Sequence, residues 1–273
     1  SSSKHYSVVS IIWNKLFDNG DIYKKTYSGL YCIGCESFKS DKDIINNCCP
    51  DHPHTKLEIV EEENYFFKLN KYKESIINWI DCNQDVLQPS YKINELKNLI
   101  NEYDDISISR LRKNVPWGIQ VPNDPNHTIY IWIEALSNYF LSAGYLTDEF
   151  KWDYVIQTCG PDNLRFQAFI FQALLESLNI KKSDKILIHG TLLDSNGNKM
   201  SKTVGNVIDP IDQLNKYGCD AIRYYCLFGL NTYSNSNWNE SDLINYYNSN
   251  ICNEWGNVIS RVLHLIDTKC NGI

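Results

Sequence analysis

Apolar residues recur at helical spacing at the start of the chain, and strand-like patterns follow. The first stretch predicts a helix over residues 6–19, which an Asn-Gly pair ends. Residues 22–30 and 57–69 have the short apolar and aromatic runs of strands, and a cysteine-rich segment separates them. Helical spacing returns over residues 71–81 and 92–102. The first third of the chain is therefore predicted to be a helix, a strand pair and two further helices.

The rest of the chain alternates between short apolar runs and helical patterns. Strands are predicted over residues 129–133, 154–158 and from Ile186 onward. Helices are predicted over residues 134–143, after Gly160-Pro161-Asp162 through Leu178, and over residues 210–230 and 241–265. The alternation is typical of right-handed crossovers and predicts an α/β fold with a parallel sheet. Ligands bind such sheets at the carboxyl ends of the strands, where Trp132, Gly160 and His189 fall.

The composition is that of an ordinary globular chain, with 43% apolar and 22% charged residues among 273. The sequence has no bilayer-length apolar run and no signal-peptide pattern. We therefore expect no membrane partner and a cytoplasmic location, with an organellar address left open. The net charge of −7 argues against a uniformly basic nucleic-acid surface, although the local cluster of Arg110, Arg112 and Lys113 suits phosphate contacts.

Four cysteine and histidine side chains have the spacing of a zinc site. Cys32 and Cys35 are three positions apart, and Cys49 and His52 repeat that spacing further along. Four such ligands suit a tetrahedral zinc ion and leave no open position for chemistry, so the expected role is structural. Cys48 is the alternative to Cys49, and a set of inert small side chains is the alternative to a metal site.

A strand, a turn and a lysine pair follow one another over residues 186–210. The apolar run ends at His189-Gly190, an Asp-Ser-Asn-Gly turn follows, and then comes Lys199-Met200-Ser201-Lys202. Two ammonium groups three positions apart, on a loop that glycines leave mobile, suit the negative charge of a phosphoryl or adenylyl transfer. A solvated lysine-rich loop is the alternative.

Several segments together resemble methionyl-tRNA synthetases, a family of class I aminoacyl-tRNA synthetases, over essentially the whole chain. Besides the lysine loop and the cysteine pairs, they are residues 64–69, 106–110, 116–122, 129–139, 218–225 and 256–261. The resemblance implies an α/β fold, in which a Rossmann-type parallel sheet is interrupted by a zinc-knuckle connective insertion and followed by an α-helical anticodon-binding bundle. The implied segments are the end of the first Rossmann half (1–26), the insertion (27–112), the second half (113–190), the lysine loop with a stem-contact segment (191–237) and the start of the anticodon domain (238–273).

The resemblance also implies roles for individual residues. Around the methionine side chain it places Trp132, Ala135, Tyr139, Asn163, Gln167 and Phe171. Along ATP and the adenylate it places Gly160, Asp162, His189, Gly190, Met200, Ser201 and Lys202. The implied catalytic residues are Arg110, Lys199 and Lys202, and the implied anticodon readers are Asn257 and Arg261. Without the resemblance, the aromatic helix positions would be core, Asp162 a helix cap and Arg110 part of a surface ion pair.

Two features depart from the family pattern. Asn163 and Gln167 stand where an apolar residue and a histidine are usual, and Pro161 and Phe171 stand where lysine and tryptophan are common. The first class I signature, His-Ile-Gly-His, is not in these residues. The chain therefore resembles the second portion of a synthetase.

The expected function is methionine–tRNA ligase, with methionine, ATP and tRNA(Met) as substrates and Mg²⁺ and structural Zn²⁺ as cofactors. The presumed N-terminal half of the same enzyme is the expected protein partner. A synthetase for another apolar amino acid and a non-catalytic tRNA-binding module are the main alternatives. A zinc-ribbon interaction protein is a third, which leaves the lysine loop unexplained.

Overall fold

The structure is a computed structural model that describes residues 3–33, 37–39, 44, 48–49, 52–201 and 204–270. The chain divides into two compact units, residues 1–157 with 165–185 and residues 158–164 with 186–273. Helices and strands occur in both units, so the predicted α/β class is confirmed. No helix among the described residues is long and apolar enough to cross a membrane.

The first unit contains most of the strands. Its helical elements are α1 (Ser3–Asp18), η2 (Leu69–Tyr72), α2 (Lys73–Cys82), α3 (Lys92–Glu102), α4 (Ile131–Ser142), η4 (Phe166–Ile170) and α5 (Phe171–Ser177). Its strands are β1 (Ile22–Cys32), β2 (Ser37–Lys39), β3 (Cys48–Cys49), β4 (His52–Lys56), β5 (Glu58–Phe67), β6 (Leu87–Gln88), β7 (Ile106–Ser107), β8 (Ser109–Leu111), β9 (Gln120–Val121) and β10 (Asp124–Ile129). The chain passes between the units within β11 (Ile156–Cys159), between residues 164 and 165, and within β12 (Lys185–Ile188).

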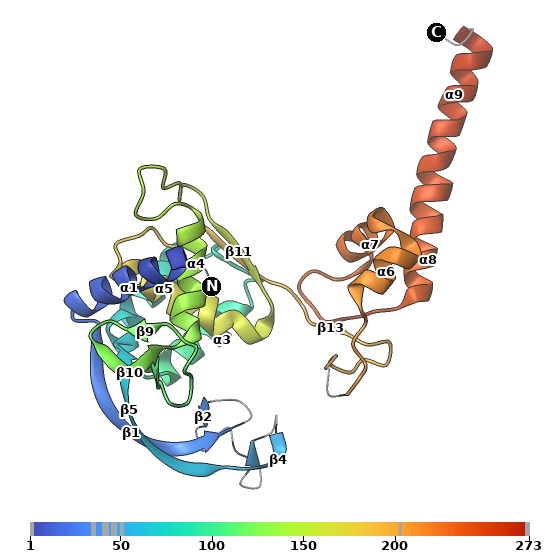
Figure 1. Cartoon of the computed structure of the whole chain (residues 1–273). Coiled ribbons are helices and arrows are strands. Elements are labelled where there is room, and N and C mark those ends of the chain that lie inside the picture. The colour runs from blue at the N-terminus through green and yellow to red at the C-terminus, as the bar shows by residue number, and fades with distance from the viewer. Residues whose placement is uncertain are drawn as a thin grey trace. The chain divides into compact units, whose positions relative to one another are not determined.

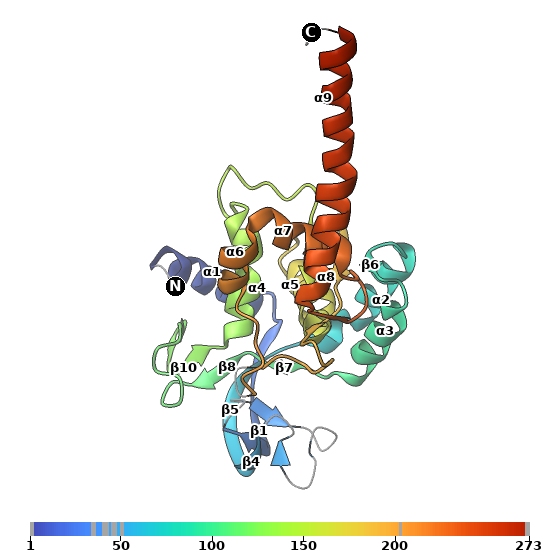
Figure 2. The same ribbon diagram turned by 90° about the vertical axis from the view of Figure 1, so that its right-hand side faces the viewer.

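A long antiparallel hairpin dominates the first unit. Strands β1 and β5 pair from Ile22 opposite Phe67 to Tyr31 opposite Glu58, and they form the curved ribbon in Figure 1. They are the middle strands of a sheet with the order β2-β1-β5-β7, and the other sheets have the orders β8-β10-β9, β11-β12-β6 and β3-β4. Helices α2 and α3 follow the hairpin in the chain and lie side by side (Figure 2). The predicted strand pair and both helices are confirmed.

The core of the first unit begins with the apolar stripe of α1. Val9, Ile12, Trp13 and Leu16 are buried, as their helical spacing predicts. The helix stops before Gly20, whose φ of 72° lies in the left-handed region. The sequence therefore predicts both the buried face and the end of this helix.

The strand predicted over residues 129–133 is wrong in its bounds. β10 already ends at Ile129, and α4 starts at Ile131 after an extended Tyr130. Alternating isoleucines suggested a strand, but Ile133, Leu136 and Phe140 are buried at helical spacing. Because these three residues are buried on one face, the segment forms a helix instead of a strand. Trp132 therefore lies in the first turn of α4.

The second unit is mainly helical, as predicted for the last third of the chain. Its elements are η3 (Pro161–Asn163), β13 (Leu192–Leu193), α6 (Pro210–Tyr217), α7 (Cys219–Tyr224), η5 (Tyr225–Gly229), β14 (Ser236–Asn237), α8 (Glu240–Tyr246), η6 (Tyr247–Trp255) and α9 (Gly256–Cys270). β13 and β14 pair in parallel. Tyr225, Trp238 and Leu243 form the core of this unit, and α9 extends away from its other helices (Figure 1).

Candidate active site

A buried arginine on β8 faces the segment that leads into α4. Arg110 is only 7% exposed, and its guanidinium carbon lies 3.8 Å from the centre of the Tyr130 ring. Its Nη1 donates to Ser107 Oγ at 3.0 Å and to the Ser109 carbonyl at 2.8 Å. Among the described residues no carboxylate pairs with Arg110, and its buried Nε has no hydrogen-bond partner. Arg110 is therefore not part of a surface ion pair, and its charge remains available to an anion.

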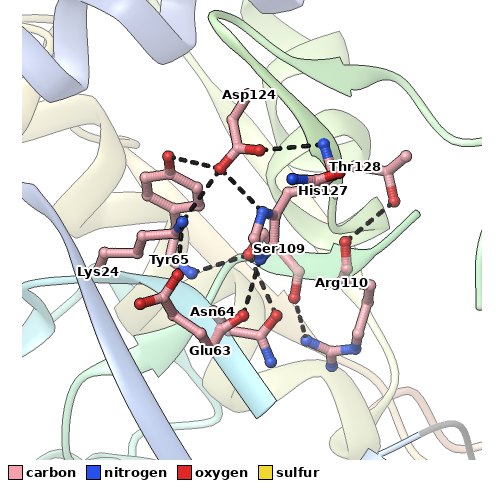
Figure 3. Close-up of polar contacts among 10 residues, drawn as sticks. Lys24, Glu63, Asn64, Tyr65, Ser109, Arg110, Asp124, His127 and Thr128 are labelled. Atoms are coloured by element: carbon pink, nitrogen blue, oxygen red, sulfur yellow. Dashed lines mark hydrogen bonds and ion pairs between the residues drawn. The ribbon is translucent and has the colours of Figure 1, made fainter. Parts of the chain in front are cut away.

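A polar network joins the β1–β5 hairpin to β10 (Figure 3). Asp124 Oδ2 accepts hydrogen bonds from Tyr65 OH at 3.0 Å and from His127 Nδ1 at 2.9 Å, and it lies 3.2 Å from Lys24 Nζ. Lys24 Nζ also lies 2.6 Å from Glu63 Oε2, and His127 Nε2 lies 2.7 Å from the Glu63 carbonyl oxygen. Since β10 leads directly into α4, this network fixes the strand that carries the start of the aromatic helix.

An aromatic cavity opens beside Arg110 in the first unit. The Trp132 and Phe166 rings are stacked, with centres 3.7 Å apart and planes 13° from parallel. The cavity has a volume of about 210 Å³, and its lining is mostly apolar and aromatic with two arginines. It is lined by Tyr103, Ile106, Ser107, Ile108, Arg110, Tyr130, Trp132, Ile133, Arg165, Phe166 and Ile170. Such a lining suits an apolar side chain attached to a charged head group.

The other predicted pocket residues of the first unit fall into two groups. Ala135 and Tyr139 are exposed at positions three and seven after Trp132, so the three residues share one side of α4. Gln167 is buried behind Tyr139 and donates from Nε2 to its hydroxyl oxygen at 3.1 Å. Phe171 is fully buried and meets Tyr139 edge to face, with ring centres 5.5 Å apart. Phe171 therefore supports the predicted wall from within the core.

Phe166 was not singled out from the sequence. It lies one position before Gln167, within an apolar stretch that indicates only a buried helix. The stacking partner of Trp132 is about thirty residues away in the chain, and no local pattern connects the two positions. Only the tertiary fold identifies Phe166 as a wall of the cavity.

In the second unit, an ion pair connects the η3 turn with the lysine loop. Lys199 Nζ lies 2.9 Å from Asp162 Oδ2, and both side chains are largely exposed, at 68% and 75%. Asp162 therefore pairs with a lysine instead of capping a helix. His189 follows β12 and is exposed, and a Cβ on Gly160 would lie 3.6 Å from its ring. Asn163 is half-buried in the same turn as Asp162.

Side-chain hydrogen bonds organise the loop that carries Lys199. Asp194 Oδ2 accepts from Asn206 Nδ2 at 2.9 Å, and Asp194 Oδ1 accepts from the backbone N–H groups of residues 196 and 198. The Asn206 side chain and these backbone donors hold the pKa of Asp194 below its usual value. Asn206 Oδ1 in turn accepts from the Ser201 backbone at 2.9 Å. Met200 packs against the core of the second unit, and Lys202 lies outside the described residues.

Gly190 is one of the glycines expected to leave the lysine loop mobile, but the structure gives it a packing role. A Cβ at this position would lie 1.9 Å from the Ser234 carbonyl oxygen, so no other residue fits without displacing the backbone. The Gly190 N–H also donates to the Thr232 carbonyl at 2.9 Å. Gly190 therefore allows two backbone segments of the second unit to pack closely.

The structure describes two of the four predicted zinc ligands. Cys32 and Cys49 are fully buried in one cluster with Leu57. Cys49 lies opposite His52 in the β3–β4 hairpin, whereas the His52 side chain and Cys35 lie outside what the structure describes. Two buried cysteines of one cluster fit the donor set of a zinc site.

The two predicted anticodon readers lie on α9. Asn257 and Arg261 are both exposed, one helical turn apart. Several apolar residues of the same helix are also exposed, including Val258, Val262 and Leu263. The prediction of a helix at this position is confirmed, whereas a packed helical bundle is not seen in the described residues.

Comparison with known proteins gives a consistent picture. The family model described as "tRNA synthetases class I (M)" matches residues 1–56 and 52–263. The chain is 36% identical to the methionine–tRNA ligase of Synechocystis sp. over 98% of its own length and 52% of that protein. It is 38% identical to the methionine–tRNA ligase of Caldanaerobacter subterraneus subsp. tengcongensis over 98% of its own length and 42% of that protein.

The same similarity is found among solved structures. Methionyl-tRNA synthetase of Mycobacterium tuberculosis in complex with methionyl-adenylate matches 99% of the chain, with a TM-score of 0.88 and 30% identity. The chain covers 54% of that structure, so it spans about half the length of the relatives it matches. The predicted family is confirmed: the chain belongs to the class I tRNA synthetases of the methionyl (M) type.

Proposed function

We propose that the chain carries the methionine-binding and nucleotide-binding parts of a methionine–tRNA ligase. The observation that carries this proposal is the match of nearly the whole chain to a synthetase whose structure holds methionyl-adenylate. Because the chain spans about half of its relatives, we also propose that the complete enzyme includes an N-terminal half with the His-Ile-Gly-His signature.

The first unit would bind the amino acid. The cavity walled by Trp132 and Phe166 is apolar and aromatic, which suits a polarizable thioether. Ala135 and Tyr139 would extend this wall along α4. Arg110 would face the negative charge of the methionine carboxylate or the adenylate, because its buried guanidinium has no carboxylate partner among the described residues.

The second unit would bind ATP. Lys199 is paired with Asp162 on an exposed surface, and such a pair exchanges readily for a polyphosphate, which carries more negative charge. Lys202 would contact the same phosphates and stabilise the pyrophosphate as it leaves. Gly160, His189 and Gly190 would line the nucleotide, and Met200 and Ser201 would hold the lysine loop in place. A bound Mg²⁺ would neutralise phosphate charge.

The proposed reaction has two steps. The methionine carboxylate attacks the α-phosphorus of ATP, which gives methionyl-adenylate and releases pyrophosphate. The terminal ribose hydroxyl of tRNA(Met) then attacks the activated carbonyl and releases AMP. Neither step needs a covalent enzyme intermediate, so positioning and charge stabilisation would supply the rate.

A structural zinc ion would complete the connective insertion. The proposed ligands are Cys32, Cys35, Cys49 and His52, and the buried cluster of Cys32 with Cys49 supports them. Cys49→Ser should lower the bound zinc well below one ion per chain. Cys48→Ser is the matched control because Cys48 is only half-buried and its thiol is not in that cluster. Zinc loss in Cys48→Ser alone would assign the ligand to Cys48.

An anticodon-binding role for α9 rests on two exposed side chains. Asn257 could hydrogen-bond to base edges, and Arg261 could stack on a base or contact phosphate. Both are exposed on one side of the helix, as such contacts require. Residues 238–273 would then form the start of a helical anticodon domain.

Amino-acid binding tests the proposal and separates it from its alternatives. Calorimetric titration of the complete enzyme should give a clear preference for methionine over leucine, isoleucine, valine and cysteine. Preference for one of the others would indicate a synthetase for a different amino acid. Binding of tRNA without binding of any amino acid would indicate a non-catalytic module.

A further inference from the structure

A second cavity of the first unit shares a wall with the aromatic cavity. The Arg110 guanidinium lies over the Tyr130 ring, and both side chains line both cavities. The second cavity has a volume of about 90 Å³, and its lining also includes Tyr31, Trp117, Ile131 and Glu134. We call it the Trp117 cavity. A molecule bound in the aromatic cavity therefore has the Trp117 cavity as its direct neighbour.

Two large apolar side chains of the Trp117 cavity are exposed. Trp117 is 69% exposed and Ile131 is 51% exposed. Among the described residues no aromatic ring stacks on the Trp117 indole, and no hydrogen bond holds it. Apolar side chains that are exposed together beside a cavity are typical of a binding surface. Because the cavity is small, a planar ligand would lie over it, on the indole face.

The backbone on both sides of Trp117 is held in place. Before it, Asn114 Nδ2 donates to Glu62 Oε1 at 3.0 Å. After it, Gly118 packs so closely against β10 that a Cβ would lie 3.0 Å from the Thr128 Cβ. The indole is therefore presented by a fixed segment, and little conformational entropy is lost when a ligand covers it.

The same connection between β8 and β9 carries positive charge. Arg112 and Lys113 precede Trp117 in it, and both are exposed. Arg112 Nη1 donates to the amide oxygen of Gln120 at 2.7 Å, and neither cation pairs with a carboxylate among the described residues. Glu134, in contrast, places a carboxylate in the lining of the Trp117 cavity. These charges favour phosphates along the connection and an uncharged ring with an amino group at the cavity.

We propose that Trp117 is a stacking platform for an unpaired base at the 3′ end of tRNA(Met). The inference rests on the proposed function, in which the terminal ribose of the tRNA must reach the amino acid in the aromatic cavity. The shared wall of Arg110 and Tyr130 places Trp117 next to that point. Aromatic faces and basic side chains together are typical of single-strand binding. Cytosine and adenine, the bases of the CCA end, both carry an amino group that a carboxylate can accept from.

Removing the CCA end of the tRNA tests this contact directly in the complete enzyme. Trp117→Ala should weaken the binding of intact tRNA(Met) by about 5- to 100-fold, the usual effect of removing the aromatic partner of one base. It should not weaken the binding of tRNA(Met) that lacks the CCA end. Tyr154→Ala, at a position 65% exposed in the same unit, is the matched control and should bind both tRNAs like the native enzyme.

The two steps of the reaction separate this role from a structural one. Trp117→Ala should lower kcat/KM for aminoacylation by a similar factor, and methionine-dependent exchange between ATP and pyrophosphate much less, because the CCA end takes no part in adenylate formation. Trp117→Tyr keeps an aromatic face and should restore most of the loss.

Two results would overturn the inference. One is equal weakening of both tRNAs in Trp117→Ala, which would place the contact outside the CCA end. The other is an equal loss of exchange and aminoacylation, which would assign Trp117 to the fold or to a contact with the proposed N-terminal half. A native enzyme without methionine-dependent exchange would instead overturn the proposed function, and the inference with it.

Discussion

Replacing Asp124 by asparagine should destabilise the first unit, because Asp124 is the acceptor on which its polar network converges. The carboxylate accepts from Tyr65, His127 and the Asn126 backbone, and it lies next to Lys24 (Figure 3). Asparagine has nearly the same shape, but it carries no charge and presents an NH₂ group where these donors need an acceptor.

The pKa of Asp124 gives the magnitude. Burial alone would raise it, but hydrogen bonds from the Asn126 backbone, Tyr65 and Lys24 lower the pKa from 3.8 to about 2. That difference corresponds to about 2 kcal/mol of free energy of unfolding at neutral pH. Because the folded-state pKa is the lower one, this stabilisation is complete above pH 3.8 and is lost as the pH falls through about 2.

Urea unfolding monitored by tryptophan fluorescence measures this effect. At pH 7 the free energy of unfolding of Asp124→Asn should be about 2 kcal/mol lower than that of the native chain. Asp148→Asn is the matched control, since Asp148 is exposed in the same unit, and it should change little. The gap between Asp124→Asn and the native chain should narrow as the pH is lowered below 3.8. Equal stability of Asp124→Asn and Asp148→Asn at pH 7 would refute the reasoning. A stability difference between Asp124→Asn and the native chain that does not change with pH would refute it too.

Three further predictions concern the second unit. Gly190→Ala should lower the free energy of unfolding by roughly 1–3 kcal/mol or more, as thermal unfolding would show, because the new Cβ would lie 1.9 Å from the Ser234 carbonyl oxygen. Gly160→Ala is the control and should lower it little. Lys202→Ala should lower the rate of adenylate formation by at least tenfold with little change in methionine affinity, as pre-steady-state kinetics would show; a change in affinity alone would contradict its role. Arg261→Ala should weaken the binding of tRNA(Met) by several-fold but not that of a tRNA with an altered anticodon, and equal weakening of both would remove its reading role.

Local patterns predicted much of the fold. The stripe of α1, the long strands β1 and β5, and the helices α2 and α3 all follow from spacing and stop signals. The boundary between β10 and α4 did not, because Ile129, Ile131 and Ile133 alternate like a strand. Burial of Leu136 and Phe140 decides between the two, and burial depends on the whole fold.

In the candidate site, too, some residues could be found from the sequence and others only from the tertiary structure. The lysine loop could be found from the sequence because its residues lie close together in it, whereas the aromatic positions of α4 were identified only through the family resemblance. The stacking of Phe166 on Trp132 and the hydrogen bond from Gln167 to Tyr139 could not, since each contact joins separate segments. The burial of Arg110 without a carboxylate among the described residues is likewise a property of the tertiary structure.

Methionine-dependent exchange between ATP and pyrophosphate tests the central claim most directly. It should be measured on this chain alone, on its mixture with the proposed N-terminal half, and on the same mixture carrying Lys202→Ala. We predict exchange in the mixture only, dependent on methionine and greatly reduced by Lys202→Ala. Failure of the mixture to exchange with methionine or any other amino acid, while zinc and tRNA still bind, would contradict the assignment of methionine–tRNA ligase activity.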